Sequence, residues 1–422
     1  MLTAAFIIGG LALVAYGYWV VLLTRYPEPI EEDEIYVVTT PDLWKIRLYR
    51  KRPAGGEGEP VLLCHSAGSN RFNFQFPRGV SLMTTLVEAG YDCWMVELRG
   101  YRSSEPPFGR TRNDPEFDDY LLQDLPAVVD FIRNATGYEK IHWVGHSMGG
   151  MLLYAFDLTY GAESLASGTT LGAPPGFQGV NFRYPAVTLA MLRSSRALVE
   201  AVTRAGSPLL KFSKPRFGVL PINWENVHPR MDTAAFFHLL EITPPHVAHD
   251  LATIAATKNW IMDRGAVDVA GRLDALETPL FAIFGANDSF IPTSRAEAFF
   301  EAISNPDKRL LVLGKRYGHA ADYNHVDLTM SRAGRKEVFE PIVAWIAAHP
   351  IQPPRAEARN RGRIKTPAKK TRGRNWSTAT AGAGWWCKTG SCAANGKVPA
   401  SLPRTMARSP DRIRWPTSWM PC

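Results

Sequence analysis

The spacing of hydrophobic and polar positions changes several times along the 422 residues, and each change predicts a different structure. Residues Leu2 to Leu23 contain no charged side chain, a length that lets a helix cross about 30 Å of hydrocarbon. Tyr18, Trp19 and Tyr26 stand near the end of this segment, as aromatic residues do at a membrane interface. We therefore expect a single-pass membrane anchor over residues 1–26, with either orientation open. A cleaved signal peptide is the alternative, but the segment lacks early Lys or Arg and a small-residue cleavage site.

Strand and helix patterns alternate after residue 34 and predict an α/β domain. Two β-rich segments, EIYVVTT and WKIRLYRKRP, flank a Pro-Asp pair and predict two antiparallel strands. Short apolar runs then alternate with amphipathic segments, which is typical of parallel strands joined by helices on both faces of a sheet. These runs are PVLLCHS, YDCWMVELRG, EKIHWVG, LASGTTLGAP, TPLFAIFG and KRLLVLG. Together the segments predict a mostly parallel eight-stranded sheet over residues 34–350.

The alternation stops between residues 175 and 267. This stretch is apolar and helical in pattern, with proline breaks between segments such as PAVTLAMLRSSRALVEAV and TAAFFHLLEI. Long connections with apolar periodicity are typical of elements that pack over a functional site. We therefore expect a helical cap insertion over residues 175–267.

Composition changes again after residue 350. Residues 351–422 contain fifteen Lys or Arg and two acidic residues, which gives this segment a formal charge of +13 and leaves −5 for the preceding chain. The segment has no apolar period, so we expect a disordered basic tail. The preceding domain, with its ordinary charge, is not expected to bind nucleic acid. The tail, with its interleaved tryptophans, has three interpretations: binding of anionic lipid, binding of nucleic acid, or a solvated extension.

The cysteines predict neither a disulfide framework nor a metal site. They are Cys64, Cys93, Cys387, Cys392 and Cys422, and their spacing provides no set of four zinc ligands. Asp322 and Asp327 stand beside two histidines and resemble metal ligands, but nothing else in the chain completes such a site. No metal and no cofactor are expected.

A serine stands in a glycine-rich turn between a strand and a helix. The pentapeptide Gly145 to Gly149 has the spacing G-x-S-x-G, and small residues there permit a sharp turn that lifts the Ser147 hydroxyl out of the sheet. The positive end of the following helix faces any oxyanion formed beside it. We predict Ser147 as a nucleophile, with the backbone N–H groups of Met148 and Ala67 as oxyanion donors.

A serine hydroxyl becomes a good nucleophile only beside a base that is oriented by an acid, here expected in the order Ser, acid, His. Asp288 follows a predicted strand at the carboxyl edge of the sheet and is our candidate acid. A loop aspartate that makes a local turn bond is the alternative interpretation. Two histidines follow the last strand, and we prefer His325 as base because it directly precedes the run that leads into the closing helix. His319 stays open as an alternative base.

Six motifs in this order resemble the α/β-hydrolase superfamily, and within it the acid-lipase-like serine esterases and lipases. They are YVVTTPDLWKIRLYRKRP, VLLCHSAGSNRFNF, GYDCWMVELRGYRSS, VGHSMGG, GANDSFIP and DYNHVDL, and they cover the chain from about residue 36 to 348. The family's His-Val/Leu-Asp pattern aligns with His325. The resemblance implies Ser147 as nucleophile, Asp288 as acid, His325 as base, and Ala67 and Met148 as oxyanion donors.

Two departures from the family pattern concern the loops around this site. The chain has His65-Ser66 where such proteins usually have His-Gly, and RGYRSS where RGHGRS is common. A side chain at Ser66 puts the donor geometry of the oxyanion loop in question. Polyester synthases also resemble this stretch, but they carry a cysteine where Ser147 stands, which favours hydrolysis.

The leading hypothesis is a serine hydrolase that cleaves carboxylic esters through an acyl-enzyme. The apolar cap and the expected anchor favour apolar acyl or lipid esters as substrates, reached at a membrane. Acyl transfer on the same scaffold is the second enzymatic hypothesis. The third hypothesis is a noncatalytic protein of this fold that binds a lipid or a partner.

Overall fold

The described part of the chain is built on one large sheet. The computed structural model describes residues 2–174, 196–207, 221–231 and 233–354. Eight strands follow the order β1-β2-β4-β3-β5-β6-β9-β10, in which β1-β2 and β2-β4 are antiparallel pairs and the other pairs are parallel. The strands are β1 (Glu34–Thr39), β2 (Lys45–Lys51), β3 (Pro60–Cys64), β4 (Asp92–Glu97), β5 (Ile141–His146), β6 (Leu165–Leu171), β9 (Leu280–Gly285) and β10 (Lys308–Leu313). The predicted mostly parallel eight-stranded sheet is confirmed.

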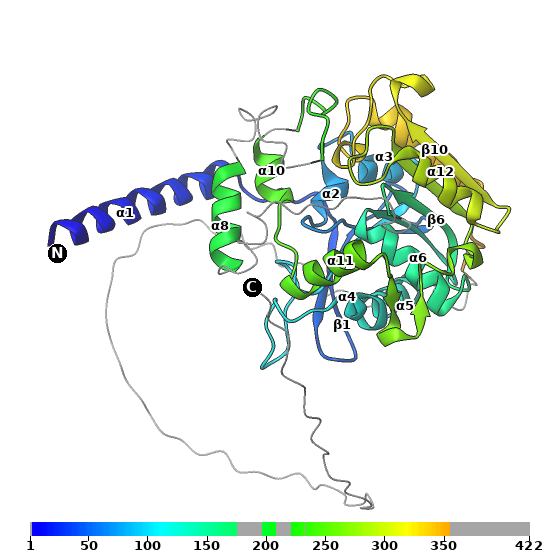
Figure 1. The fold of residues 1–422 in the computed structure, drawn as a ribbon, viewed down its shortest axis with the longest axis horizontal. Coiled ribbons are helices and arrows are strands. Elements are labelled where there is room, and N and C mark those ends of the chain that lie inside the picture. The colour runs from blue at the N-terminus through cyan, green and yellow to red at the C-terminus, as the bar shows by residue number, and fades with distance from the viewer. Residues whose placement is uncertain (1, 175–195, 208–220, 232, 355–422) are drawn as a thin grey trace, which may run out of the picture. The chain divides into compact units, whose positions relative to one another are not determined.

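Helices cover both faces of the sheet, and each face has its own hydrophobic core (Figure 1). Leu62 of β3 belongs to the core that includes residues of α5, α6 and α12, whereas Leu63 belongs to the core under α3 and α13. Neighbouring strand residues point to opposite faces, which explains this division. Every residue of the central strands β3, β4 and β5 is buried, as expected for a sheet covered on both sides. The helices of the domain are α2 (Phe72–Gln75), α3 (Leu82–Glu88), α4 (Phe117–Asp119), α5 (Leu125–Thr136), α6 (Met148–Tyr160), α12 (Thr293–Ala302) and α13 (Glu340–Ala347).

The segment between β6 and β9 contains the helices expected of the cap. Its described elements are α8 (Arg196–Gly206), α10 (Thr233–Leu239), α11 (Pro245–Thr257) and the short antiparallel pair β7 (Ile261–Met262) and β8 (Val267–Asp268). Phe236 and Leu239 of α10 pack with Phe72 and Phe76, which follow β3. Residues 175–195, 208–220 and 232 of the expected cap, and residues 355–422 of the expected tail, lie outside the described residues. The boundaries of the cap and of the tail therefore stay predictions.

The first helix, α1 (Leu2–Arg25), covers the segment predicted as an anchor. Its C-terminal half contacts the insertion: the Tyr18 hydroxyl donates to the Ala205 carbonyl at 2.9 Å, and the Trp19 and Phe237 ring centroids lie 6.3 Å apart. Within the described ranges, no helix combines the length and the hydropathy that crossing a membrane requires. The predicted helix is confirmed, whereas the membrane anchor is not.

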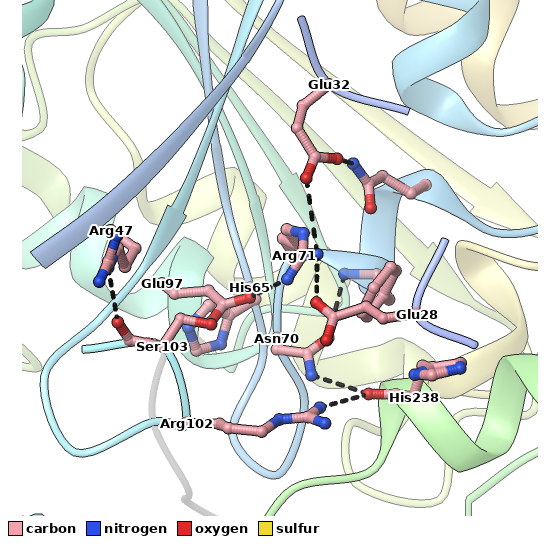
Figure 2. Close-up of polar contacts among 12 residues, drawn as sticks. Glu28, Glu32, Arg47, His65, Asn70, Arg71, Glu97, Arg102, Ser103 and His238 are labelled. Atoms are coloured by element: carbon pink, nitrogen blue, oxygen red, sulfur yellow. Dashed lines mark hydrogen bonds and ion pairs between the residues drawn. The ribbon is translucent and has the colours of Figure 1, made fainter. Parts of the chain in front are cut away.

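Ion pairs hold the acidic linker between α1 and β1 on the domain. The Arg71 guanidinium lies 2.6 Å from Glu28 and 3.7 Å from Glu32 of the linker, and 2.9 Å from Glu97 of β4 (Figure 2). The Gln75 amide also donates to the Glu32 carboxylate at 3.3 Å. Because Arg71, Glu32 and Glu97 are buried, the linker packs as part of the folded domain.

Candidate active site

Ser147 lies in a strained turn between the end of β5 and the start of α6. Its φ of 51° and ψ of −114° are unfavourable for a residue with a side chain. The glycines around it leave room for this turn, because a Cβ on Gly145 would lie 2.3 Å from the Gly149 carbonyl oxygen. A Cβ on Gly149 would lie 2.1 Å from the Cys64 carbonyl oxygen at the end of β3. The turn therefore depends on glycine at both positions, as the sequence predicts.

The structure brings Ser147, His325 and Asp288 together in one hydrogen-bonded chain. The Ser147 Oγ lies 2.8 Å from His325 Nε2, and His325 Nδ1 lies 2.9 Å from Asp288 Oδ2. The other carboxylate oxygen of Asp288 accepts the backbone N–H groups of Phe290 at 2.8 Å and Ile291 at 3.2 Å. Both Asp288 and His325 are buried. Asp288 therefore accepts a hydrogen bond from the imidazole while its own orientation is fixed by the backbone.

The alternative base, His319, is engaged elsewhere. Its Nδ1 lies 3.3 Å from the backbone nitrogen of Gly314, and its own backbone N–H donates to the Gly314 carbonyl at 3.2 Å. These contacts hold His319 in the turn that follows β10. Of the two histidines, His325 is the one within hydrogen-bond distance of Ser147.

The loop that carries His325 is held by a buried carboxylate. Asp327 accepts the backbone N–H of Asn223 at 2.9 Å and the side-chain amide of Asn226 at 2.7 Å, which both belong to the insertion. It also accepts the backbone N–H of Asn324 at 3.1 Å. Burial raises the pKa of Asp327 to about 6. Asp327 thus ties the His325 loop to the insertion, and this link could not be read from the sequence.

The two predicted oxyanion donors come from the start of a helix and from a loop. Met148 is the first residue of α6, and Ala67 lies in the loop after β3. Among the described residues, neither the Ala67 N–H nor the Met148 N–H donates to a protein acceptor. The close contact between Gly149 and the end of β3 brings these two segments together. Both N–H groups are therefore available to a ligand, as the predicted role in stabilising an oxyanion requires.

The serine that departs from the family pattern is held by Asn73. The Asn73 Oδ1 accepts the Ser66 backbone N–H at 3.2 Å, the Ser66 hydroxyl at 3.1 Å and the Ser69 hydroxyl at 3.0 Å. The neighbouring His65 donates from Nδ1 to the Ser66 carbonyl at 2.8 Å and accepts the Leu98 N–H at Nε2 at 3.3 Å. Both the backbone N–H and the hydroxyl of Ser66 therefore have a hydrogen-bond partner within this loop.

His146 connects this oxyanion loop to the loop of His325. Its Nδ1 lies 2.9 Å from Asn73 Oδ1, and its Nε2 lies 3.1 Å from the His325 carbonyl oxygen. Burial, followed by the nearby His325, lowers the pKa of His146 to about 3, so the ring is neutral near pH 7 and donates one of these two bonds. The sequence predicts only a packing role for His146 and does not single out Asn73. The one signal for this role in the sequence is that His146 directly precedes Ser147, the predicted nucleophile.

Metal-binding groups are not assembled in the described ranges, where no three His, Cys, Asp or Glu side chains converge on one point. Asp322, one of the acids that resemble ligands in the sequence, accepts the backbone N–H of Lys315 at 2.9 Å. Asp327 is engaged by the backbone and amide donors described above. Both acids therefore have structural partners.

Comparison with known proteins concerns the fold of the domain that carries this site. The family model described as "alpha/beta hydrolase fold" matches residues 59–206, which include strands β3 to β6 and the Ser147 turn. This match covers about a third of the chain and shows that this part is similar to the α/β-hydrolase superfamily. The resemblance predicted from six motifs is therefore confirmed. In this hydrolase, Ser147 directly follows β5, the fifth strand along the chain.

Several lipases are similar to this hydrolase. Lipase 1 of Drosophila melanogaster is 22% identical over 365 residues, which cover 79% of this chain and 81% of that protein. The gastric triacylglycerol lipase of Mus musculus is 36% identical over 141 residues, which cover 30% of this chain and 35% of the lipase. The more identical match thus spans about a third of the gastric lipase. The lipase relatives support a carboxylic ester hydrolase.

Solved structures of esterases share the fold. An esterase from Thermogutta terrifontis has a TM-score of 0.50 and 21% identity, with 75% of this chain and 100% of the esterase covered. An esterase from Exiguobacterium antarcticum has a TM-score of 0.51 and 19% identity, with 73% and 98% covered. At such identities the likeness concerns the fold, and it extends well beyond the segment matched by the family model.

Proposed function

We propose that this hydrolase cleaves carboxylic esters through an acyl-enzyme formed on Ser147. The observation that carries the proposal is the chain of two hydrogen bonds from Ser147 through His325 to Asp288. As the Ser147 Oγ bonds to the ester carbonyl carbon, its proton passes to His325 Nε2. Asp288 stabilises the imidazolium that forms, because it accepts the Nδ1–H. The N–H groups of Ala67 and Met148 donate to the oxyanion.

The second half of the reaction regenerates the free serine. When the tetrahedral intermediate collapses, the bond to the leaving oxygen breaks, and His325 gives its proton to the departing alcohol. A water molecule then loses a proton to His325 and bonds to the acyl carbon. Collapse of this second intermediate releases the carboxylic acid and returns the proton to Ser147. No oxidant, reductant or metal enters these steps.

We further propose that the substrates are esters with apolar acyl groups. Support comes from the insertion, which contributes Ile222, Val227 and Phe236 to a buried apolar cluster that also contains Phe72 of α2. Apolar side chains of the insertion thus pack against the segment that follows the oxyanion loop, and sites for apolar ligands are typically lined by such residues. The names of the lipase relatives point to the same class of substrate.

The test is hydrolysis of p-nitrophenyl esters of increasing acyl length by the full chain. We expect turnover that falls by about 10⁴-fold or more in Ser147→Ala. We also expect kcat/KM to rise from acetate to longer acyl groups, because each buried methylene adds about 0.8 kcal/mol. Full turnover by Ser147→Ala would contradict the acyl-enzyme. Preferential formation of a methyl ester at low methanol concentration would instead support acyl transfer.

A further inference from the structure

A small cavity of about 140 Å³ lies where α1 meets the insertion, apart from Ser147, His325 and Asp288. Its walls come from α1, from α8, from the segment between α10 and α11 and from the loop after β4. The residues that carry the argument are the apolar Trp19 and Leu240, the cations Arg102 and Arg204, and the acids Glu200 and Glu241. The cavity therefore joins an apolar wall to a group of charges.

Arg204 has no carboxylate partner in this cavity. Among the described residues, no acidic oxygen lies within ion-pair distance of its guanidinium, and its buried Nε donates to no acceptor. The guanidinium lies over two aromatic rings, 4.3 Å from the Phe237 centroid and 5.5 Å from the Trp19 centroid. Burial, followed by the nearby Arg102, lowers the pKa of Arg204, and the carboxylates of Glu241, Glu28 and Glu200 offset only part of this shift.

The nearby acids are each bound to another arginine. Glu200 lies 2.8 Å from Arg196 and 3.5 Å from Arg112. Glu28 lies 2.6 Å from Arg71, as Figure 2 shows. These carboxylates are therefore engaged away from Arg204.

Glu241 is held in the same way by Arg102. The Arg102 Nε lies 3.2 Å from the Glu241 carboxylate, which also accepts the Asn70 amide at 2.8 Å. The Arg102 guanidinium also donates to the His238 carbonyl at 3.1 Å (Figure 2). Arg102 is thus fixed in place beside Arg204. Neither Glu241 nor Glu200 forms an ion pair with the Arg204 guanidinium.

We propose that this cavity binds the carboxylate of an alkyl carboxylic acid. Arg204 would donate to the carboxylate oxygens, which are the acceptors that a guanidinium matches best. Trp19 and Leu240 would contact the first methylenes of the chain. The choice of an alkyl acid rests on the proposed function, because ester cleavage releases this class of product. The cavity and its charged side chains are features of the structure and do not depend on whether the protein cleaves esters.

The test is isothermal titration calorimetry with octanoate, inorganic phosphate and 1-octanol, using the full-length Ser147→Ala variant. This variant cannot form an acyl-enzyme, so binding is measured whether or not Ser147 is a nucleophile. We expect octanoate to bind at least about tenfold more tightly than either phosphate or octanol, because both the charge and the chain contribute. Equal binding of octanoate and octanol would overturn the proposal. Phosphate that binds as tightly as octanoate would also overturn it and indicate a site for a free anion.

Variants of Arg204 assign the binding to this cavity. Arg204→Gln should weaken octanoate binding at least about tenfold, and Arg204→Lys should restore part of the affinity because it keeps the charge. Arg295→Gln is the matched control, since Arg295 is an exposed arginine on another helix, α12. Unchanged octanoate binding in Arg204→Gln would overturn the proposal. If Arg204→Gln does not fold, the affinity for octanoate is measured with Arg204 intact, with and without about 0.5 M salt. Because salt screens an ionic contact, an unchanged affinity would overturn the proposal.

Discussion

Gly172 lies directly against the imidazole of His325. A Cβ on Gly172 would stand 3.0 Å from His325 Nδ1, and the backbone there has a φ of +54°. The same Nδ1 lies 2.9 Å from Asp288. A side chain at position 172 would therefore press on the ring at the atom that bonds to the carboxylate.

Gly172→Ala should lower kcat by about tenfold or more, because a displaced imidazole loses its alignment with Ser147 and Asp288. Gly318→Ala is the matched control. Gly318 also has a positive φ, +88°, but nothing lies within 4 Å of a Cβ built there. Both variants should lose about 1 kcal/mol of unfolding free energy from backbone strain. Steady-state kinetics and urea denaturation measure both effects, and equal kcat values in the two variants would contradict this role of Gly172.

We expect the oxyanion loop to depend on Asn73 more than on the side chain of Ser66. Asn73→Ala removes the acceptor shared by the Ser66 N–H, Ser66 Oγ and Ser69 Oγ, and leaves buried donors unpaired. We expect kcat to fall by about tenfold to a hundredfold with a smaller change in KM, because the loop carries a predicted oxyanion donor. Ser66→Gly, which restores the residue usual in the family, should stay within about threefold of wild type. A larger fall in kcat in Ser66→Gly than in Asn73→Ala would contradict this prediction.

The pH dependence of stability tests the neutral state of His146. Burial lowers the pKa of His146 to about 3 in the folded protein, against 6.5 as its ordinary value. Between these values the unfolded chain binds a proton that the folded protein does not bind, so stability falls as the pH falls below about 6.5. The contribution of this one group is about 1.4 kcal/mol per pH unit.

His146→Gln should therefore show a shallower loss of unfolding free energy between about pH 6 and pH 4, by about 1.4 kcal/mol per unit. Urea denaturation of both proteins across this range measures the difference, and above about pH 7.5 the two slopes should agree. Identical slopes below pH 6 would indicate that folded His146 carries two protons. The ring would then donate one hydrogen bond to Asn73 and a second one to the His325 carbonyl.

Local patterns were sufficient to predict the sheet and the Ser147 turn. The apolar runs that became β3, β4 and β5 are buried on both faces, and short runs of this kind between turn signals are typical of strands in a covered sheet. The glycines at 145 and 149 are required within a few residues of Ser147, so the spacing itself indicates the turn. The preference for His325 over His319 agrees with the geometry, although the catalytic roles stay predictions.

The sequence could not predict contacts between segments that are distant along the chain. The bond from His146 to Asn73 joins residues 73 positions apart, and Asp327 reaches Asn226 across 101 positions. Tyr18 contacts Ala205 across 187 positions, and this contact joins the C-terminal half of α1 to the insertion. Hydrophobic periodicity does not specify such pairs, because it describes which side of an element is buried and leaves its partner undefined.

The most direct test of the central claim is the rate at which a fluorophosphonate labels Ser147, followed by intact mass and by peptide mapping. Wild type should be labelled once, at Ser147, and Ser147→Ala should not be labelled. His325→Ala should react about 10³-fold or more slowly, because the hydroxyl loses its base, whereas His319→Ala should stay within about threefold of wild type. Labelling of His325→Ala at the wild-type rate, or labelling at another residue, would contradict activation of Ser147 by His325.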